Sequence, residues 1–174
     1  HVLFRRQRQM CIRDSYGTLR SRAVLEKVIA RSSKNLELLP IFVPNSELRL
    51  VVNETFPVIV FSHNYKGVEG TLVRGLKPED ILRILFFEDV EFTPQFLTLG
   101  IDGKQEKVKY FSQKGVKPSD KYWSFEEWRQ SNEKLSVITA ELWMDLYGKF
   151  TAEEANQYWN DIKKKAIKKY QLQV

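Results

Sequence analysis

Two short segments of the sequence combine residue types that could bind and convert a small molecule. The first is Tyr16-Gly17-Thr18-Leu19, which stands directly before a predicted helix. A glycine lets the backbone approach a ligand closely, and exposed amides at a helix N-terminus bind a carboxylate or a developing oxyanion. The same residues also suit a tight turn capped by threonine. The pattern alone leaves both interpretations open.

The second segment, residues 86–92, reads Phe-Phe-Glu-Asp-Val-Glu-Phe and contains three carboxylates. The helix dipole disfavours an acid at the C-terminal end of a helix by ~0.3–1 kcal/mol, so three acids at this position are candidates for a functional role. Glu88 directly follows Phe87, and a carboxylate in apolar surroundings becomes a stronger base as it loses hydration. Three acids facing water in a loop explain the spacing equally well. Glu88 is the candidate base, and Asp89 and Glu91 are expected to contribute much less.

The elements that must position these segments can be predicted from periodicity. Apolar residues at helical spacing predict a helix over 21–31, and Pro78 opens a second helix in which Glu79 and Asp80 complement the helix dipole. Asp102-Gly103 predicts a hairpin turn between two strands. Runs rich in branched or alternating apolar residues predict strands at 36–43, 48–52, 57–61, 68–73, 95–101 and 105–111.

The C-terminal third is predicted to be helical. Ser124 followed by Glu127 forms a capping box that starts a long helix to about Tyr147, and Thr151 followed by Glu154 starts a final helix. Residues 115–120 between the hairpin and these helices are predicted to be a loop. The order of elements indicates an α+β fold with a mixed or antiparallel sheet.

Three segments together resemble the γ-glutamylcyclotransferase-like family, including its plant avirulence-induced branch. Tyr16–Leu19 matches the family's Tyr-Gly-x-Leu, and residues 67–92 match its strand, its Pro-Glu-Asp helix and the glutamate that follows. Residues 123–128 resemble the Trp-x-Phe-Glu-Glu segment of the plant-like branch. The resemblance covers roughly residues 16–147. Leu85 stands where the family has aspartate, Phe92 where tyrosine is usual, and residues 13–15 where an apolar strand is usual.

The resemblance implies a small, mostly closed mixed or antiparallel β-barrel with flanking helices. It also implies an enzyme that releases 5-oxoproline and a free amine from a γ-glutamyl amine, amino acid or peptide, without metal or cofactor. Glu88 would be the general acid/base. A catalytically weak small-molecule-binding barrel of the same fold is the alternative. The candidate substrate-binding residues are Tyr16, Gly17, Thr18, Leu19, Phe92, Tyr110 and Tyr122.

Composition narrows the class of protein further. The 174 residues include one cysteine and two histidines, so an intrachain disulfide is impossible and a Cys/His zinc site is not expected. No apolar run approaches the ~18 residues that a membrane span needs. The expected partner is a small γ-glutamyl substrate in the cytoplasm, with neither nucleic acid nor membrane, and the oligomeric state stays open.

Charge and sequence pattern divide the chain into three predicted parts. Residues 1–15 carry +3 of the net charge of +6 and contain QMCIRD, which resembles translated sequencing-adapter read-through, so they are predicted to be non-native. A basic arm that binds RNA or a membrane is the alternative. Residues 16–150 form the predicted γ-glutamylcyclotransferase-like domain. Residues 151–174 carry +2 and form a C-terminal basic helix.

Overall fold

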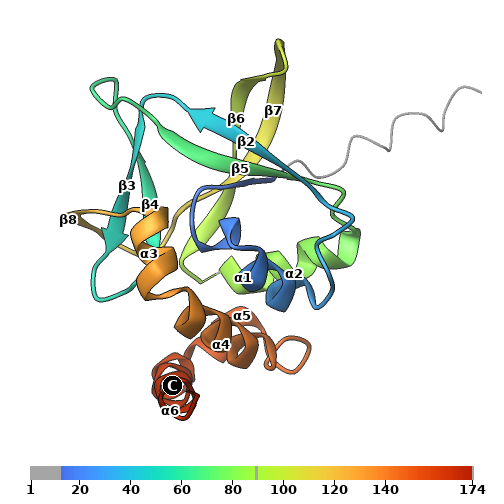
Figure 1. Cartoon of the computed structure of the whole chain (residues 1–174), viewed down its shortest axis with the longest axis vertical. Helices are drawn as coiled ribbons and strands as arrows, with labels where there is room; N and C mark the ends of the chain where they lie inside the picture. Colours follow the sequence, from blue (N-terminus) through green and yellow to red (C-terminus); the bar gives the residue numbers. More distant parts are fainter. Residues whose placement is uncertain (1–12, 89, 174) are drawn as a thin grey trace, which may run out of the picture.

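The computed structural model describes residues 13–88 and 90–173, so most of the predicted non-native segment lies outside the described residues. Within them the elements run in the order β1 (Arg13–Ser15), η1 (Thr18–Arg20), α1 (Arg22–Ile29), β2 (Glu37–Val43), β3 (Ser46–Val51), β4 (Pro57–Phe61), β5 (Val68–Arg74), α2 (Pro78–Glu88), β6 (Phe92–Ile101), β7 (Lys104–Gln113), β8 (Pro118–Tyr122), α3 (Phe125–Ser131), α4 (Glu133–Met144), α5 (Ala152–Asn156) and α6 (Trp159–Gln171). The class is α+β, as predicted (Figure 1).

The strands form two separate sheets. The larger has the order β2-β5-β1-β7-β6 and the smaller the order β4-β3-β8. Only β1 and β7 pair in parallel among the described strands, so the larger sheet is mixed, as predicted. The predicted barrel closure is wrong. The central strand β3 pairs with β4 and β8 within the small sheet. No ladder between the described strands joins the outer strands β4 and β8 to the larger sheet.

Strand β1 lies in the middle of the larger sheet although it is only three residues long. It pairs with β5 in the register Arg13↔Val73, Asp14↔Leu72 and Ser15↔Thr71, and with β7 through Arg13↔Lys109. The chain therefore leaves the centre of the sheet directly into Tyr16. Residues 13–15, which we assigned to the non-native segment, thus occupy the position of the strand that precedes the Tyr-Gly-Thr-Leu loop.

The local turn signal between β6 and β7 is confirmed. Ile101 pairs with Lys104, and the two residues between them, Asp102 and Gly103, have φ values of 50° and 76°. Two consecutive positive φ values are typical of a type I′ turn, which matches the twist of a hairpin. The predicted loop at 115–120 is partly wrong, because β8 begins at Pro118. Most side chains of β8 are exposed, so the strand lacks the alternation by which a half-buried strand is recognised.

The helices gather at one end of the molecule beneath the sheets, with α6 outermost (Figure 1). Both predicted helix starts are confirmed, since the Ser124 hydroxyl accepts the Glu127 amide at 3.3 Å and Thr151 and Glu154 form a reciprocal capping box. The predicted long helix to Tyr147 is interrupted at Asn132, and the final helix is split into α5 and α6. Helix α1 packs against α2 and α4, and α4 packs against α6.

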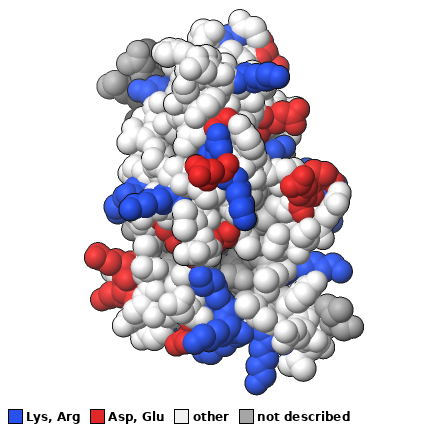
Figure 2. All heavy atoms as spheres, turned by 90° about the vertical axis from the view of Figure 1, so that its left-hand side faces the viewer, with Lys and Arg blue, Asp and Glu red and all other residues white. Residues whose placement is uncertain are grey.

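Basic side chains gather at the end of the molecule where α6 lies, while basic and acidic side chains intermingle over the rest of the same face (Figure 2). Helix α6 carries Lys163, Lys164, Lys165, Lys168 and Lys169. Of these, Lys163 is half-buried and turns toward the interior of the protein, where it pairs with Glu54. In the described part of the chain, no helix has the length and apolar character that crossing a membrane requires.

The carboxylate of Glu141 on α4 links this helix to α1 and α6. Glu141 accepts from Lys27 of α1 at 2.7 Å and from Lys169 of α6 at 2.9 Å. These two hydrogen bonds, with the charges of both lysines, lower the pKa of Glu141 from 4.5 to about 2.

We expect Glu141 to make stability depend on pH in the acid range. A carboxyl whose pKa is lower in the folded than in the unfolded protein stabilises the fold above its unfolded pKa. This contribution is lost as the pH falls from about 4.5 to about 2. Denaturant unfolding of the wild type and of Glu141→Gln at several pH values measures it. The difference between the two proteins should shrink over that range, and a difference independent of pH would contradict the assignment.

Candidate functional site

A cavity of about 240 Å³ lies where the larger sheet, the turn between β3 and β4, and the helical layer meet. Its size is just below the ~300–1,000 Å³ of pockets for drug-sized ligands, so it suits a smaller molecule. The walls come from the segment between β1 and α1, the end of α2 with the start of β6, residues 53–57, and helices α4 and α6. Both segments singled out in the sequence therefore lie on one cavity.

The loop of residues 16–19 is held in place by contacts at its start and at its end. The Tyr16 hydroxyl donates to the carbonyl oxygen of Phe111, and the side chains of Tyr16 and Leu19 are buried. Gly17 has a φ of −104°, so it is not needed for a left-handed backbone. A Cβ at this position would lie 3.3 Å from Cγ of Pro57, so a larger residue would require the proline ring to shift by a few tenths of an ångström. The loop ends at Ser21, whose hydroxyl accepts the Val24 amide at 3.3 Å and caps α1.

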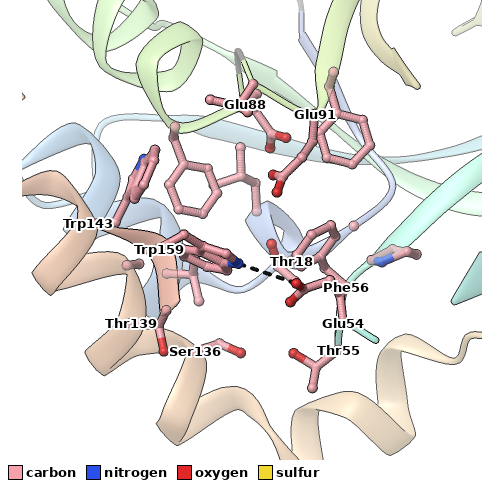
Figure 3. A pocket seen from close by; sticks show the side chains of 18 of the residues that line it. Thr18, Glu54, Thr55, Phe56, Glu88, Glu91, Ser136, Thr139, Trp143 and Trp159 are labelled. Carbon is pink, nitrogen blue, oxygen red and sulfur yellow. Dashed lines mark hydrogen bonds between the residues drawn. The ribbon is translucent and has the colours of Figure 1, made fainter. Parts of the chain in front are cut away.

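Glu88 is the last residue of α2, and its half-buried side chain lines the cavity together with Gly17 and Thr18. Its carboxylate points into the cavity (Figure 3). The buried ring of Phe92 lines the same space. The structure thus brings together Glu88, Phe92 and the whole loop 16–19, as the sequence analysis expected for one site.

Tyr110 and Tyr122 do not reach this cavity. Tyr110 alternates along β7 with Phe111, and because neighbouring side chains of a strand point to opposite faces, only Phe111 lines the cavity. The Tyr110 ring packs edge-on against Phe61 at 5.8 Å, and burial raises the pKa of its hydroxyl. Tyr122 is 71% exposed and lies under the Arg49 guanidinium at 4.1 Å. Their expected role in binding the substrate therefore has no support from their positions.

Glu91 is the main residue whose place sequence reasoning missed. It does not simply face water: its side chain is half-buried and lines the cavity, and its carboxyl group points into the same space as that of Glu88 (Figure 3). Burial, followed by the charge of Glu54, raises the pKa of Glu91 from 4.5 to about 7, although Lys163 opposes this shift. Its protonated and ionised forms are therefore both populated near neutral pH.

Glu54 connects the turn before β4 to the last helix. Its Oε1 atom accepts from Nζ of Lys163 at 2.9 Å and from Nε1 of Trp159 at 3.3 Å. Trp159 in turn packs edge-on against Trp143 of α4, with 5.5 Å between ring centroids. The two tryptophans lie beside Ser136 and Thr139, which also line the cavity, so the wall contributed by α4 and α6 is mainly apolar with two hydroxyls (Figure 3).

Glu54, Glu88 and Glu91 all line the cavity, but they do not make a metal site. Among the described residues, no three His, Cys, Asp or Glu side chains come together in a way that could hold a metal ion. The side chains that line the cavity can transfer protons. Glu88 places a carboxyl group at the end of α2, the raised pKa of Glu91 lies near neutral pH, and Glu54 is paired with Lys163.

Comparison with known proteins gives the fold. No family model matches the chain, and a search of curated proteins found no significant match. A solution structure of At5g39720.1 from Arabidopsis thaliana aligns with a TM-score of 0.54 and 18% identity, over 80% of this chain and 95% of that one. The crystal structure of the uncharacterized protein PH0828 from Pyrococcus horikoshii aligns with a TM-score of 0.51 and 19% identity, over 70% and 94%. The chain shares the fold of these proteins.

A structure described as a gamma-glutamyl cyclotransferase also aligns, over 88% of this chain and 98% of its own, with 11% identity and a TM-score of 0.46.

Proposed function

We propose that this protein is a γ-glutamylcyclotransferase-type enzyme. Its substrate would be a γ-glutamyl amine, amino acid or peptide, and its products 5-oxoproline and the free amine. The proposal is based on one observation: Glu88 and the loop of residues 16–19 line the same cavity of about 240 Å³. These residues belong to two of the three segments on which the sequence resemblance to the family rests, and a shared cavity is what a common catalytic site requires.

In the proposed reaction, the carboxylate of Glu88 takes a proton from the α-ammonium group of the substrate. The amine that results attacks the γ-carbonyl carbon of the same molecule. The bond from that carbon to the leaving nitrogen then breaks as this nitrogen takes up a proton, so that the free amine departs. The backbone of Gly17 to Leu19 would hold the substrate's α-carboxylate or the developing oxyanion. Binding the substrate in a folded conformation favours ring closure, because good orientation alone can lower such a barrier by several kcal/mol, up to ~7–11 kcal/mol.

The experiment that tests the function is direct. The full chain is incubated with a panel of γ-glutamyl amines, amino acids and dipeptides, and 5-oxoproline is quantified by chromatography. α-Glutamyl isomers are the matched controls, because their amide bond is at the α-carbonyl, and attack of the α-amine there would require a three-membered ring and so cannot release the amine. We expect 5-oxoproline from at least one γ-glutamyl compound and none above background from the α-isomers. Equal signals from both sets, or none from either, would contradict the proposal.

A second candidate function is a binding protein that keeps the cavity but reacts poorly. The observation that favours it is Phe92, which lines the cavity but lacks the hydroxyl that the family usually has at this position. Trp143 and Trp159 line the same cavity, so ligand binding should change their fluorescence. A saturable change of fluorescence with a γ-glutamyl compound, without any 5-oxoproline, would select this second function.

A further inference from the structure

We propose that Glu91 is a second proton-transfer group of the cavity, which protonates the leaving nitrogen while Glu88 deprotonates the attacking one. This inference rests on the proposed cyclotransferase function. It goes beyond a mechanism with a single carboxylate, because it assigns two different proton transfers to two different side chains.

The proton balance of the reaction calls for more than one transfer. At neutral pH, the α-nitrogen of the substrate has three hydrogens and ends as a ring amide with one. The nitrogen of an alkylamine leaving group has one hydrogen in the amide and ends as an ammonium group with three. Two protons must therefore pass from the attacking to the leaving nitrogen in each turnover, and one carboxyl group can carry only one at a time.

Two carboxyl groups complete this exchange and return to their starting states. Ionised Glu88 takes the first proton, and the nitrogen lone pair then forms the new C–N bond while the carbonyl electron pair moves onto oxygen. As this pair re-forms the carbonyl, the old C–N bond breaks and the leaving nitrogen takes the proton of neutral Glu91. Glu91 then accepts the surplus proton of the ring nitrogen, and Glu88 gives its proton to the released amine.

The geometry fits this division of roles. Glu88 ends α2 and Glu91 lies directly before β6, so the two side chains are fixed by different elements although they are close in sequence. Both line the cavity that also contains the Tyr16–Leu19 loop, and both carboxyl groups point into it (Figure 3). A substrate held by the loop would therefore lie in the same cavity as both carboxyl groups.

The charges around Glu91 favour a proton donor. Glu88 of α2, Glu54 of the turn before β4, and Lys163 of α6 are the charged side chains that share the cavity with it in the described structure. Burial and Glu54 raise the pKa of Glu91 to about 7, while Lys163 opposes them. A general acid works best when its pKa lies near the working pH, because it is then both protonated and acidic enough to donate.

The first test varies the basicity of the leaving amine on one carbon skeleton. The substrates are γ-glutamyl ethylamide and γ-glutamyl 2,2,2-trifluoroethylamide, and kcat is measured for the wild type and Glu91→Gln. The fluorinated amine departs with less help from a proton donor. We expect Glu91→Gln to lower kcat about 10²-fold for the ethylamide and about tenfold or less for the fluorinated amide. A purely structural role of Glu91 would lower both by the same factor.

The second test follows pH. Because Glu91 must be protonated to act, kcat for the ethylamide should fall as the pH rises through about 7. Glu91→Gln should remove this alkaline limb. Lys163→Met removes a charge that lowers the pKa of Glu91, so the limb should move to higher pH. Glu54→Gln removes a charge that raises it, so the limb should move to lower pH. Circular dichroism confirms that each variant is folded.

The outcomes separate the two proposals. If the wild type forms no 5-oxoproline from any γ-glutamyl compound, both the proposed function and the role of Glu91 are contradicted. If the wild type is active but Glu91→Gln affects both amides equally, or keeps the alkaline limb, only the role of Glu91 is overturned. A selective loss on the ethylamide, together with opposite shifts in Lys163→Met and Glu54→Gln, supports it.

Discussion

Glu88→Gln is expected to lower the rate of 5-oxoproline formation by ~10²–10⁴-fold, the range that general base catalysis typically contributes. Glutamine keeps the size and the hydrogen-bonding reach of the side chain, but it cannot accept the proton of the substrate's ammonium group. The fold and the affinity for the substrate should change little. The measurement is kcat by product chromatography, with binding followed through the fluorescence of Trp143 and Trp159, which line the cavity.

The matched control for Glu88→Gln is Glu79→Gln in the same helix. Glu79 lies in the first turn of α2, is exposed, and does not line the cavity, so the same chemical change there should leave kcat near the wild-type value. If Glu88→Gln still forms 5-oxoproline at nearly the wild-type rate, Glu88 has no part in the mechanism. Glu91→Gln is not a suitable control, because Glu91 shares the cavity.

Asp80→Ala is expected to cause the largest loss of stability. Asp80 is only 2% exposed, and its two carboxylate oxygens accept from Arg31 at 2.9 and 2.5 Å, while Oδ2 also accepts the Lys77 amide at 2.6 Å. Burial alone would raise the pKa of Asp80, but the hydrogen bonds from Arg31 and Lys77, with the charge of Arg31, outweigh it and lower the pKa. The pair fixes the start of α2 against the segment after α1.

Removing one partner of a buried ion pair typically costs ~3–5 kcal/mol, because the other charge is left without its counter-ion. The Arg31 side chain is partly accessible to water, so we expect the lower end, about 3 kcal/mol, for Asp80→Ala. Urea unfolding measures this loss. The exposed neighbour Glu79 is the control, and Glu79→Ala should cost about 1 kcal/mol or less. Equal losses in both variants would show that the Arg31–Asp80 pair does not hold α2 in place.

The features that the sequence predicted well depend on neighbours along the chain. The Asp102-Gly103 turn and the caps at Ser124 and Thr151 are encoded within a few residues, and all three are confirmed. The break at Asn132 and the strand at 118–122 were missed. The exposed side chains of β8 give no alternation, so the strand has no local signal. At the break, the apolar periodicity continues past Asn132, and asparagine, a residue type favoured at helix N-caps, is the only local sign of a new helix start.

Features that depend on distant partners could not be predicted. The closure of the sheets depends on whether an outer strand of the small sheet, β4 or β8, pairs with an outer strand of the larger sheet, β2 or β6, and no such pairing joins the described strands. The sequence could show that Glu88 and Glu91 are acids near an apolar helix. It could not show that residues 54 and 163 surround Glu91, because their contacts join parts of the chain that only the folded structure brings together.

The origin of the cavity walls has a consequence for engineering. The carboxyl groups assigned to proton transfer come from the short stretch between α2 and β6, whereas the facing wall comes from Leu135, Ser136 and Thr139 of α4 and Ile167 of α6. Substitutions in the two helices can enlarge the cavity or change its polarity without altering the backbone that holds Glu88 and Glu91. A combinatorial library confined to these four positions should therefore alter which amine is released while the ring-closing chemistry is retained.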